Sequence, residues 1–309
     1  MNCLRSVLRS SFAVVLLTTL PCCQHDQSKP QDPPATGGGG PGNASGAPAG
    51  AAEEARKLIE LMQQQFKDEK IVVDAKAQTV SIPAVVNESR DPVEYLLIHR
   101  KGKRHEAVFF TMAKPSVLNT ALLLVGLQPG KNAQVIEKSP LPTLEEVERG
   151  VDPVIVVPPK GEPFWMTVRW KGADGEVVEH CVEDLLYELS TQQPVRSVQW
   201  VYLGGRMARL YKNEPEVYVA DFEGNLVSTC YMSPDNHLAT MVHPNARDDQ
   251  NWWTTNLLPA AGTEVEFVFH HNEPKLQVER RQRLQREDAA APKPAAGAGD
   301  KPAGEAPPK

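Results

Sequence analysis

A chain of 309 residues with a formal net charge of −6 lacks the clustered basic face of a nucleic-acid-binding protein. Both ends are of low complexity, so the globular composition is confined to about 200 residues between positions 70 and 272, enough for one domain. Only Cys181 and Cys230 of the five cysteines fall in this part, which excludes a zinc ribbon or an iron–sulfur cluster held by about four ligands.

Residues 1–23 have the layout of an export signal of the lipoprotein type. Arg5 and Arg9 precede an apolar run at residues 12–20, which is too short to span a membrane. Cys22 and Cys23 follow in a segment that resembles a bacterial lipoprotein cleavage box, and we interpret either one as the acylated residue. Pro21 departs from the small residue usual there, so a plain secretory signal is the alternative.

The segments that flank the globular part differ in pattern. Residues 24–52 have almost nothing to bury, so we expect a disordered tether. Residues 53–69 are expected to form an amphipathic helix, because Leu58, Met62 and Phe66 recur every four residues. Residues 273–309 begin as a charged segment and continue as an Ala/Pro/Gly-rich disordered tail.

Residues 70–272 are predicted to form a single globular domain around one helix. Strands are expected at residues 93–99 and 105–111, joined as a hairpin by the basic turn between them. A helix then begins at Pro115, which suits the first helical turn. Residues 117–127 are almost entirely apolar, so we expect this helix to be covered on nearly all sides and to form the centre of the core.

The rest of the domain reads mostly as short strands. Asp174 and Gly175 predict a hairpin turn, and the acidic start of residues 183–191 predicts a short helix there. Trp252 and Trp253 lie in a long loop with few periodic signals. Strands are expected at residues 70–86 (two), 163–170, 177–182, 199–203, 216–220, 226–231 and 263–270. The predicted class is α+β, a mainly antiparallel sheet with one central buried helix and a few short helices.

The sequence contains no complete catalytic motif among those sought, so a site must be inferred from scattered residues. His105, Lys114 and Asp221 are the candidate pocket residues, because a helix N-terminus near Lys114 favours anions. The plainer interpretation has His105 bonded to backbone and Lys114 solvated.

Histidines and cysteines allow weaker hypotheses. His237, His243, His270 and His271 fit no metal template in their spacing, so we expect no metal or other cofactor. Cys181 and Cys230 are a candidate disulfide if the compartment is oxidising, but spacing alone leaves the pairing open.

Several separated segments, in order, resemble the YdjY-like domain family. They are His105-Glu106, AKPS at 113–116, ALLL at 121–124, GLQPG at 126–130, YVAD at 218–221, Glu223-Gly224 and LVS at 226–228. The resemblance spans roughly residues 70–270. It implies a largely uncharacterised, often exported protein with no established catalytic residue. Some members carry a ferredoxin-like label based on cysteine clusters, which this chain lacks.

These patterns favour an exported protein of the periplasm or envelope, tethered to the membrane by a lipid. Its expected role is a non-catalytic binding or interaction module with an envelope-protein or cell-wall partner, and no nucleic acid. Two alternatives stay open: an enzyme or ligand sensor with a pocket near His105, Lys114 and Asp221, and a redox-partner protein. The oligomeric state and the ligand are not determined by the sequence.

Overall fold

The computed structural model describes residues 49–87 and 92–290. They belong to one of two units into which the chain divides, Ala49–Lys309. The predicted export signal, the lipidation candidates Cys22 and Cys23, and the tether up to residue 48 lie outside the described residues, as does the tail from residue 291.

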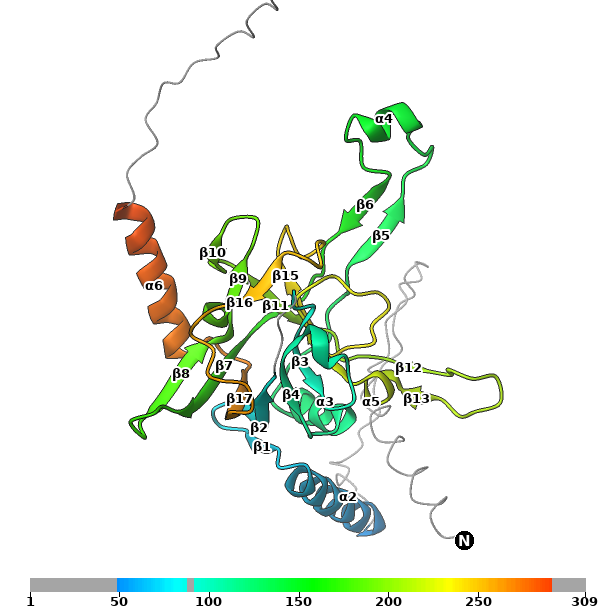
Figure 1. The fold of residues 1–309 in the computed structure, drawn as a ribbon. Coiled ribbons are helices and arrows are strands. Elements are labelled where there is room, and N and C mark those ends of the chain that lie inside the picture. Colours follow the sequence, from blue (N-terminus) through cyan, green and yellow to red (C-terminus); the bar gives the residue numbers. More distant parts are fainter. Residues whose placement is uncertain (1–48, 88–91, 291–309) are drawn as a thin grey trace, which may run out of the picture. The chain divides into compact units, whose positions relative to one another are not determined.

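Eight strands form a sheet that closes on itself (Figure 1). Each strand pairs with the next, and β4 returns to pair with β2. In order around the sheet they are β2 (Thr79–Val86), β17 (Glu264–His270), β7 (Pro163–Lys171), β11 (Gln199–Tyr202), β15 (Ala239–Val242), β14 (Asn225–Ser228), β3 (Tyr95–His99) and β4 (Ala107–Thr111). The fold is therefore a closed β-barrel with few helices, and the predicted α+β class was wrong.

Strand β2 closes the barrel because it pairs along both edges. One edge pairs with β17 over seven residues. The other edge pairs first with β1 (Val72–Asp74) and then, from Ala84 onward, with β4. Pro83 lies at the changeover, where its missing N–H costs no ladder hydrogen bond, and its carbonyl accepts a 2.6 Å hydrogen bond from Thr111 Oγ1.

Strands β3 and β4 run parallel, so the predicted hairpin between them was also wrong. Their link is residues 100–106, which includes the 3₁₀ turn η1 (Arg104–Glu106). Parallel neighbours usually need a connection of about a dozen residues. Here the link packs closely on the chain: a Cβ on Gly102 would lie 2.8 Å from Gly224 O, so glycine is required at this crossing.

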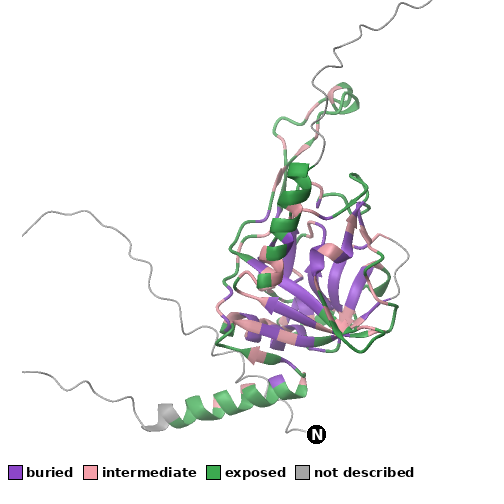
Figure 2. Cartoon of the chain, turned by 90° about the vertical axis from the view of Figure 1, so that its left-hand side faces the viewer, coloured by how far each residue is buried: buried purple, intermediate pink, exposed green. Residues whose placement is uncertain are grey.

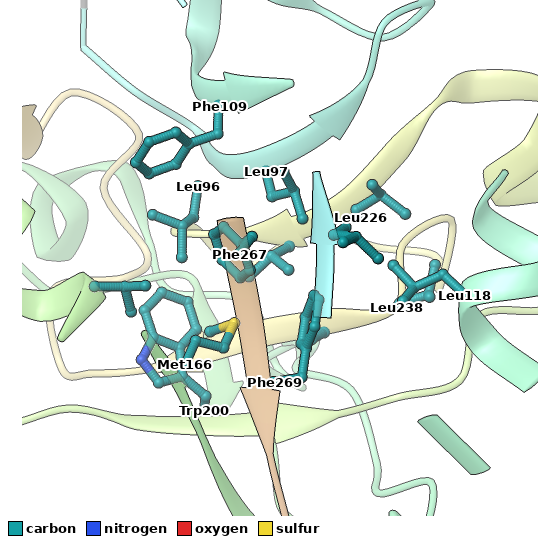
Figure 3. Packing of buried hydrophobic residues seen from close by; sticks show 14 of the residues in the cluster. Leu96, Leu97, Phe109, Leu118, Met166, Trp200, Leu226, Leu238, Phe267 and Phe269 are labelled. Carbon is teal, nitrogen blue, oxygen red and sulfur yellow. The ribbon is translucent and has the colours of Figure 1, made fainter. Parts of the chain in front are cut away.

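Side chains from the strands supply most of the core (Figure 3). Phe109 and Phe267 meet edge to face with ring centroids 5.8 Å apart, a favoured aromatic geometry. Trp200 is fully buried and donates a 2.9 Å hydrogen bond from Nε1 to Glu183 Oε1. Figure 2 shows the buried residues concentrated in the strands.

The predicted central helix is α3 (Pro115–Leu124), and it is not covered on all sides. One face is buried, with Leu118 beside Leu238 in Figure 3. Leu124 is 50% exposed. The helix packs against α2 (Ala49–Asp68), α5 (Val219–Glu223) and β2, because the core belongs to the closed sheet and needs only one helical face to cover it.

A second, three-stranded sheet lies beside the barrel. Its middle strand is β9 (Leu186–Glu188), which pairs with β10 (Gln193–Pro194) and β16 (Trp252–Thr254). The helix predicted at residues 183–191 was wrong, because this segment forms most of the 3₁₀ turn η2 (Val182–Leu185) and then β9. Trp252 is fully buried in the core. Strand β8 (Val177–Cys181) pairs with β7 through the predicted hairpin.

Two excursions and a helix complete the described chain (Figure 1). The first, which we call the arm, is residues 131–160: β5 (Gln134–Glu137) and β6 (Val154–Val157) form a two-stranded ribbon that carries α4 (Leu144–Glu148) at its tip. The second pairs β12 (Met207–Ala208) with β13 (Val217–Tyr218). Helix α6 (Lys275–Ala290) packs on β8.

Among the described helices, none is both long and apolar enough to cross a membrane.

Candidate functional site

Two of the predicted pocket residues meet at the start of α3. Asp221 of α5 accepts hydrogen bonds of 2.8 Å from Ser116 N and from Ser116 Oγ. Its Oδ2 lies 3.4 Å from Lys114 Nζ. Lys114 N donates to Glu69 Oε2 at 2.9 Å. Carboxylates from two other segments thus cap the free N–H groups of this helix.

The capping carboxylates occupy the place where an external anion would bind. Asp221 lies in the first turn of α5, and the helix ends at Gly224, whose φ of 79° is in the left-handed region. A carboxylate satisfies the orphan N–H groups and also complements the positive end of the helix dipole. The arrangement therefore supports packing of α3 on α5.

His105 lies at the opposite end of β4 from Lys114. It belongs to η1, its side chain is 70% exposed, and its Nε2 lies 3.1 Å from Glu106 Oε1. Nearby, Lys103 Nζ lies 3.2 Å from Glu106 and 3.4 Å from Glu94. Burial, with the neighbouring Glu106, raises the pKa of Glu94. The structure thus joins Lys114 to Asp221 and places His105 in a different cluster; a ligand pocket at the three residues stays a prediction.

Cys181 and Cys230 are both free, buried thiols. Cys181 ends β8 opposite Thr167, whereas Cys230 Sγ lies 3.8 Å from Asp248 O. Burial raises the pKa of both thiols, that of Cys230 to about 12. Thiols of this kind react slowly, because the thiolate is the reactive form.

The four candidate histidines are dispersed. His270 Nε2 lies 2.9 Å from Thr167 Oγ1, and His271 Nδ1 lies 2.8 Å from Val125 O. His237 is almost fully buried, and burial lowers its pKa to about 4. His243 stacks edge to face on Trp252. Among the described residues, no three His, Cys, Asp or Glu side chains converge as metal ligands.

A buried carboxylate that sequence reasoning did not single out lies in β9. Glu188 Oε1 accepts from Asn245 Nδ2 at 2.6 Å and from Ser190 Oγ at 3.0 Å, and Oε2 accepts from Thr191 Oγ1 at 3.2 Å. Burial alone would raise the pKa of Glu188, but the hydrogen bonds from Asn245 and Ser190 hold it below its usual value. This carboxylate ties the loop around residue 245 to the second sheet.

The most unusual surface in the described chain is the arm. Its exposed apolar side chains run from the ribbon to the tip: Val135, Ile136, Leu141, Leu144, Val147, Val151 and Ile155. Leu144 at the tip is 75% exposed. Five prolines between residues 140 and 159 favour extended, irregular chain in this segment. The signal for the ribbon is two short segments rich in β-branched residues, QVIE at 134–137 and VIVV at 154–157.

Comparison with known proteins gives one finding. No curated protein and no solved structure matches the chain. Residues 71–270, well over half of the chain, match the YdjY domain. This match begins at β1 and ends with β17, so it covers the whole barrel and the arm. The chain therefore belongs to the YdjY domain family.

Proposed function

We propose that this protein is an exported, lipid-tethered, non-catalytic interaction module that docks a partner protein of the cell envelope through its arm. The observation that supports it is the concentration of unpartnered apolar side chains on a ribbon that stands away from the barrel (Figure 1). The leader and the low-complexity segment after it support export and tethering.

The register of the ribbon places apolar side chains on both of its faces. Residues opposite each other in an antiparallel pair share a face, so one face carries Val135, Val154 and Val156 and the other carries Ile136, Ile155 and Val157. A two-stranded ribbon is only marginally stable in water by itself. An exposed apolar surface of this kind marks a binding site on a soluble domain.

The carboxylates at the tip of the arm indicate which charge the partner's surface should carry. Helix α4 presents Glu145 and Glu148, which form no ion pair with any described residue, next to Leu144 and Val147. A capping box between Thr143 and Glu146 fixes the helix start. The complementary surface is an apolar cleft with Lys or Arg at its rim.

Photo-crosslinking in intact cells tests this role. A photoreactive residue replaces Leu144 at the arm tip or, as control, Val177, an apolar residue of the β7–β8 hairpin that is 63% exposed. We expect a discrete adduct from position 144 alone, identified by mass spectrometry.

The purified partner should bind the full-length protein and lose affinity at least tenfold with the Leu141→Ser, Leu144→Ser double variant, but not with Val177→Ser. Equal adducts from both positions, or none from the arm, would refute docking.

Fatty-acid labelling tests the tether separately. We expect labelled palmitate in the wild-type protein and none in the Cys22→Ser, Cys23→Ser double variant. An unlabelled wild-type protein would leave a plain secretory signal as the explanation of the leader.

A further inference from the structure

An aromatic hollow of about 460 Å³ lies beside the excursion between β12 and β13. It is far in sequence from the arm, and neither the capped start of α3 nor the arm includes its residues. Its lining is Leu210, Tyr211, Glu214, Pro215, Val217 and Phe222.

Two exposed aromatic rings form walls of this hollow. Tyr211 is 61% and Phe222 is 55% exposed. Their ring centroids are 6.3 Å apart and their planes meet at 72°, so the two faces open onto a shared corner. Phe222 is fixed by α5, whose neighbouring Asp221 is bonded to α3. Tyr211 is held by a turn in which Glu214 N donates to Tyr211 O at 3.1 Å.

Two other rings of the described chain, the buried Tyr95 and the half-buried Phe110, have one of its own cations over a face. Lys103 Nζ lies 5.9 Å from the Tyr95 ring centroid, and the Arg104 guanidinium lies 4.3 Å from that of Phe110. Over Tyr211 and Phe222, by contrast, no cation of the described chain is found. The electron-rich faces of these two rings are therefore available to a cation from outside.

A carboxylate completes the chemistry of the hollow. Glu214 lies in its lining and forms no ion pair with the cations of residues 49–87 and 92–290. The ring faces attract a positively charged ligand through their quadrupole, and the carboxylate of Glu214 attracts it by its opposite charge. The apolar side chains of Leu210 and Val217 can contact methyl groups on such a ligand. A small metal ion would lack sufficient oxygen ligands here.

We propose that the Tyr211–Phe222 hollow binds a quaternary ammonium group, carried either by a small organic cation or by a lipid headgroup. Two rings at a steep angle and one carboxylate are the elements by which proteins recognise such cations. This site is separate from the arm. The protein would therefore bind a quaternary ammonium group at the hollow and a partner protein at the arm.

Saturation-transfer NMR with the full-length protein tests the charge requirement. We expect the methyl protons of choline to receive saturation, with a dissociation constant in the millimolar range or tighter. The neutral isostere 3,3-dimethylbutan-1-ol, of the same shape, should bind at least about fivefold more weakly. Equal binding of the isostere would overturn the proposal and identify a plain apolar hollow. Absence of choline binding would overturn it as well.

Substitutions locate the site. Tyr211→Leu and Phe222→Leu should each weaken choline binding about fivefold or more, whereas Tyr211→Phe keeps a ring and should change it less than twofold. Glu214→Gln should weaken choline binding and leave that of the isostere unchanged. Leu257→Ala, a truncation of another exposed side chain, is the matched control. An equal effect of Leu257→Ala would overturn the location.

Vesicles distinguish the two sources of the cation. Sedimentation with phosphatidylcholine but not phosphatidylglycerol vesicles, lost in Phe222→Leu, would assign the site to a lipid headgroup. Binding of free choline without vesicle sedimentation would assign it to a small soluble cation. Either result supports the proposal.

Discussion

At the scale of single residues, Asp221 shows how a residue picked for chemistry can serve the fold. The sequence analysis grouped it with His105 and Lys114 near a helix N-terminus, where an anion is favoured, and Asp221 and Lys114 do form an ion pair. The same carboxylate also receives two hydrogen bonds from Ser116. Neither bond was visible in the sequence, because residues 116 and 221 are brought together only by the barrel.

The two partners of this ion pair should differ in their effect on stability. Asp221→Ala removes the helix cap and leaves the Ser116 N–H without its partner, so we expect a loss of about 1–2 kcal/mol in the free energy of unfolding. Lys114→Ala removes only a half-exposed ion pair, worth about 0–1 kcal/mol. Urea denaturation of both variants measures this difference. An equal or larger loss in Lys114→Ala would contradict the capping role.

His237 should make stability fall in mildly acidic solution. Burial holds its pKa at about 4 in the folded state, against about 6.5 in the unfolded chain. The unfolded state therefore binds the proton first, and stability present above pH 6.5 is lost as the pH falls toward 4. The loss between pH 7 and 4.5 is about 2 kcal/mol for this group.

The His237→Leu variant removes this titration. Its free energy of unfolding should fall less steeply between pH 7 and 4.5 than that of the wild type, by the same 2 kcal/mol. Urea denaturation at each pH gives both curves. Parallel curves for the two proteins would show that His237 is not the group responsible.

At the scale of elements, strand positions were predictable and strand partners were not. Alternation placed a strand at residues 263–270 and the structure has β17 at Glu264–His270. The turn at Gly175 correctly joined β7 to β8. In contrast, β3 and β4 lie close in sequence but run parallel, and no local pattern distinguishes that arrangement from a hairpin. The arm has the same limit: QVIE and VIVV read as strand segments, but their pairing with each other across 16 residues does not follow from a local pattern.

Helix α6 shows how one residue can hold an element in place. Arg280 is buried, and its guanidinium donates to Asp184 Oδ1 at 2.8 Å, to Arg196 O at 3.0 Å and to Val195 O. The charged pattern of this segment is that of a solvated helix, and it does not reveal that one of the four arginines is buried. A planar fork with several donors suits such a cluster of acceptors.

Removing the Arg280 guanidinium should weaken the packing of α6 on the rest of the domain. We expect Arg280→Ala to destabilise docking of α6 by about 3 kcal/mol, because the carbonyl groups of Val195 and Arg196 lose their partner and Asp184 keeps only the exposed Arg283. Arg281→Ala, whose side chain is 56% exposed, should cost less than 1 kcal/mol. Hydrogen exchange of the α6 amides reports the difference. Equal protection of the α6 amides from exchange in the two variants would contradict the role of Arg280 in holding this helix.

At the scale of the whole molecule, the barrel and the arm should be separable. Gln134 and Val157 are opposite each other at the base of the ribbon, so residues 135–156 can be replaced by an Asn-Gly turn. The excision removes mostly exposed side chains and the surface pair of Arg247 with Asp152. We expect a melting temperature within about 4 °C of the wild type and complete loss of arm-dependent docking. A large fall in melting temperature would make the arm part of the fold.

Closure through β2 also sets the order of events during synthesis. Strand β17 lies between β2 and β7, and its last residue is His270, so the ring has a gap until residue 270 has left the ribosome. Contacts between residues about 190 apart form slowly, because a long loop must close before they contribute. Until β17 has emerged, a growing chain of this sequence therefore cannot close its barrel and stays in the incompletely folded state that a translocation channel for unfolded chains accepts.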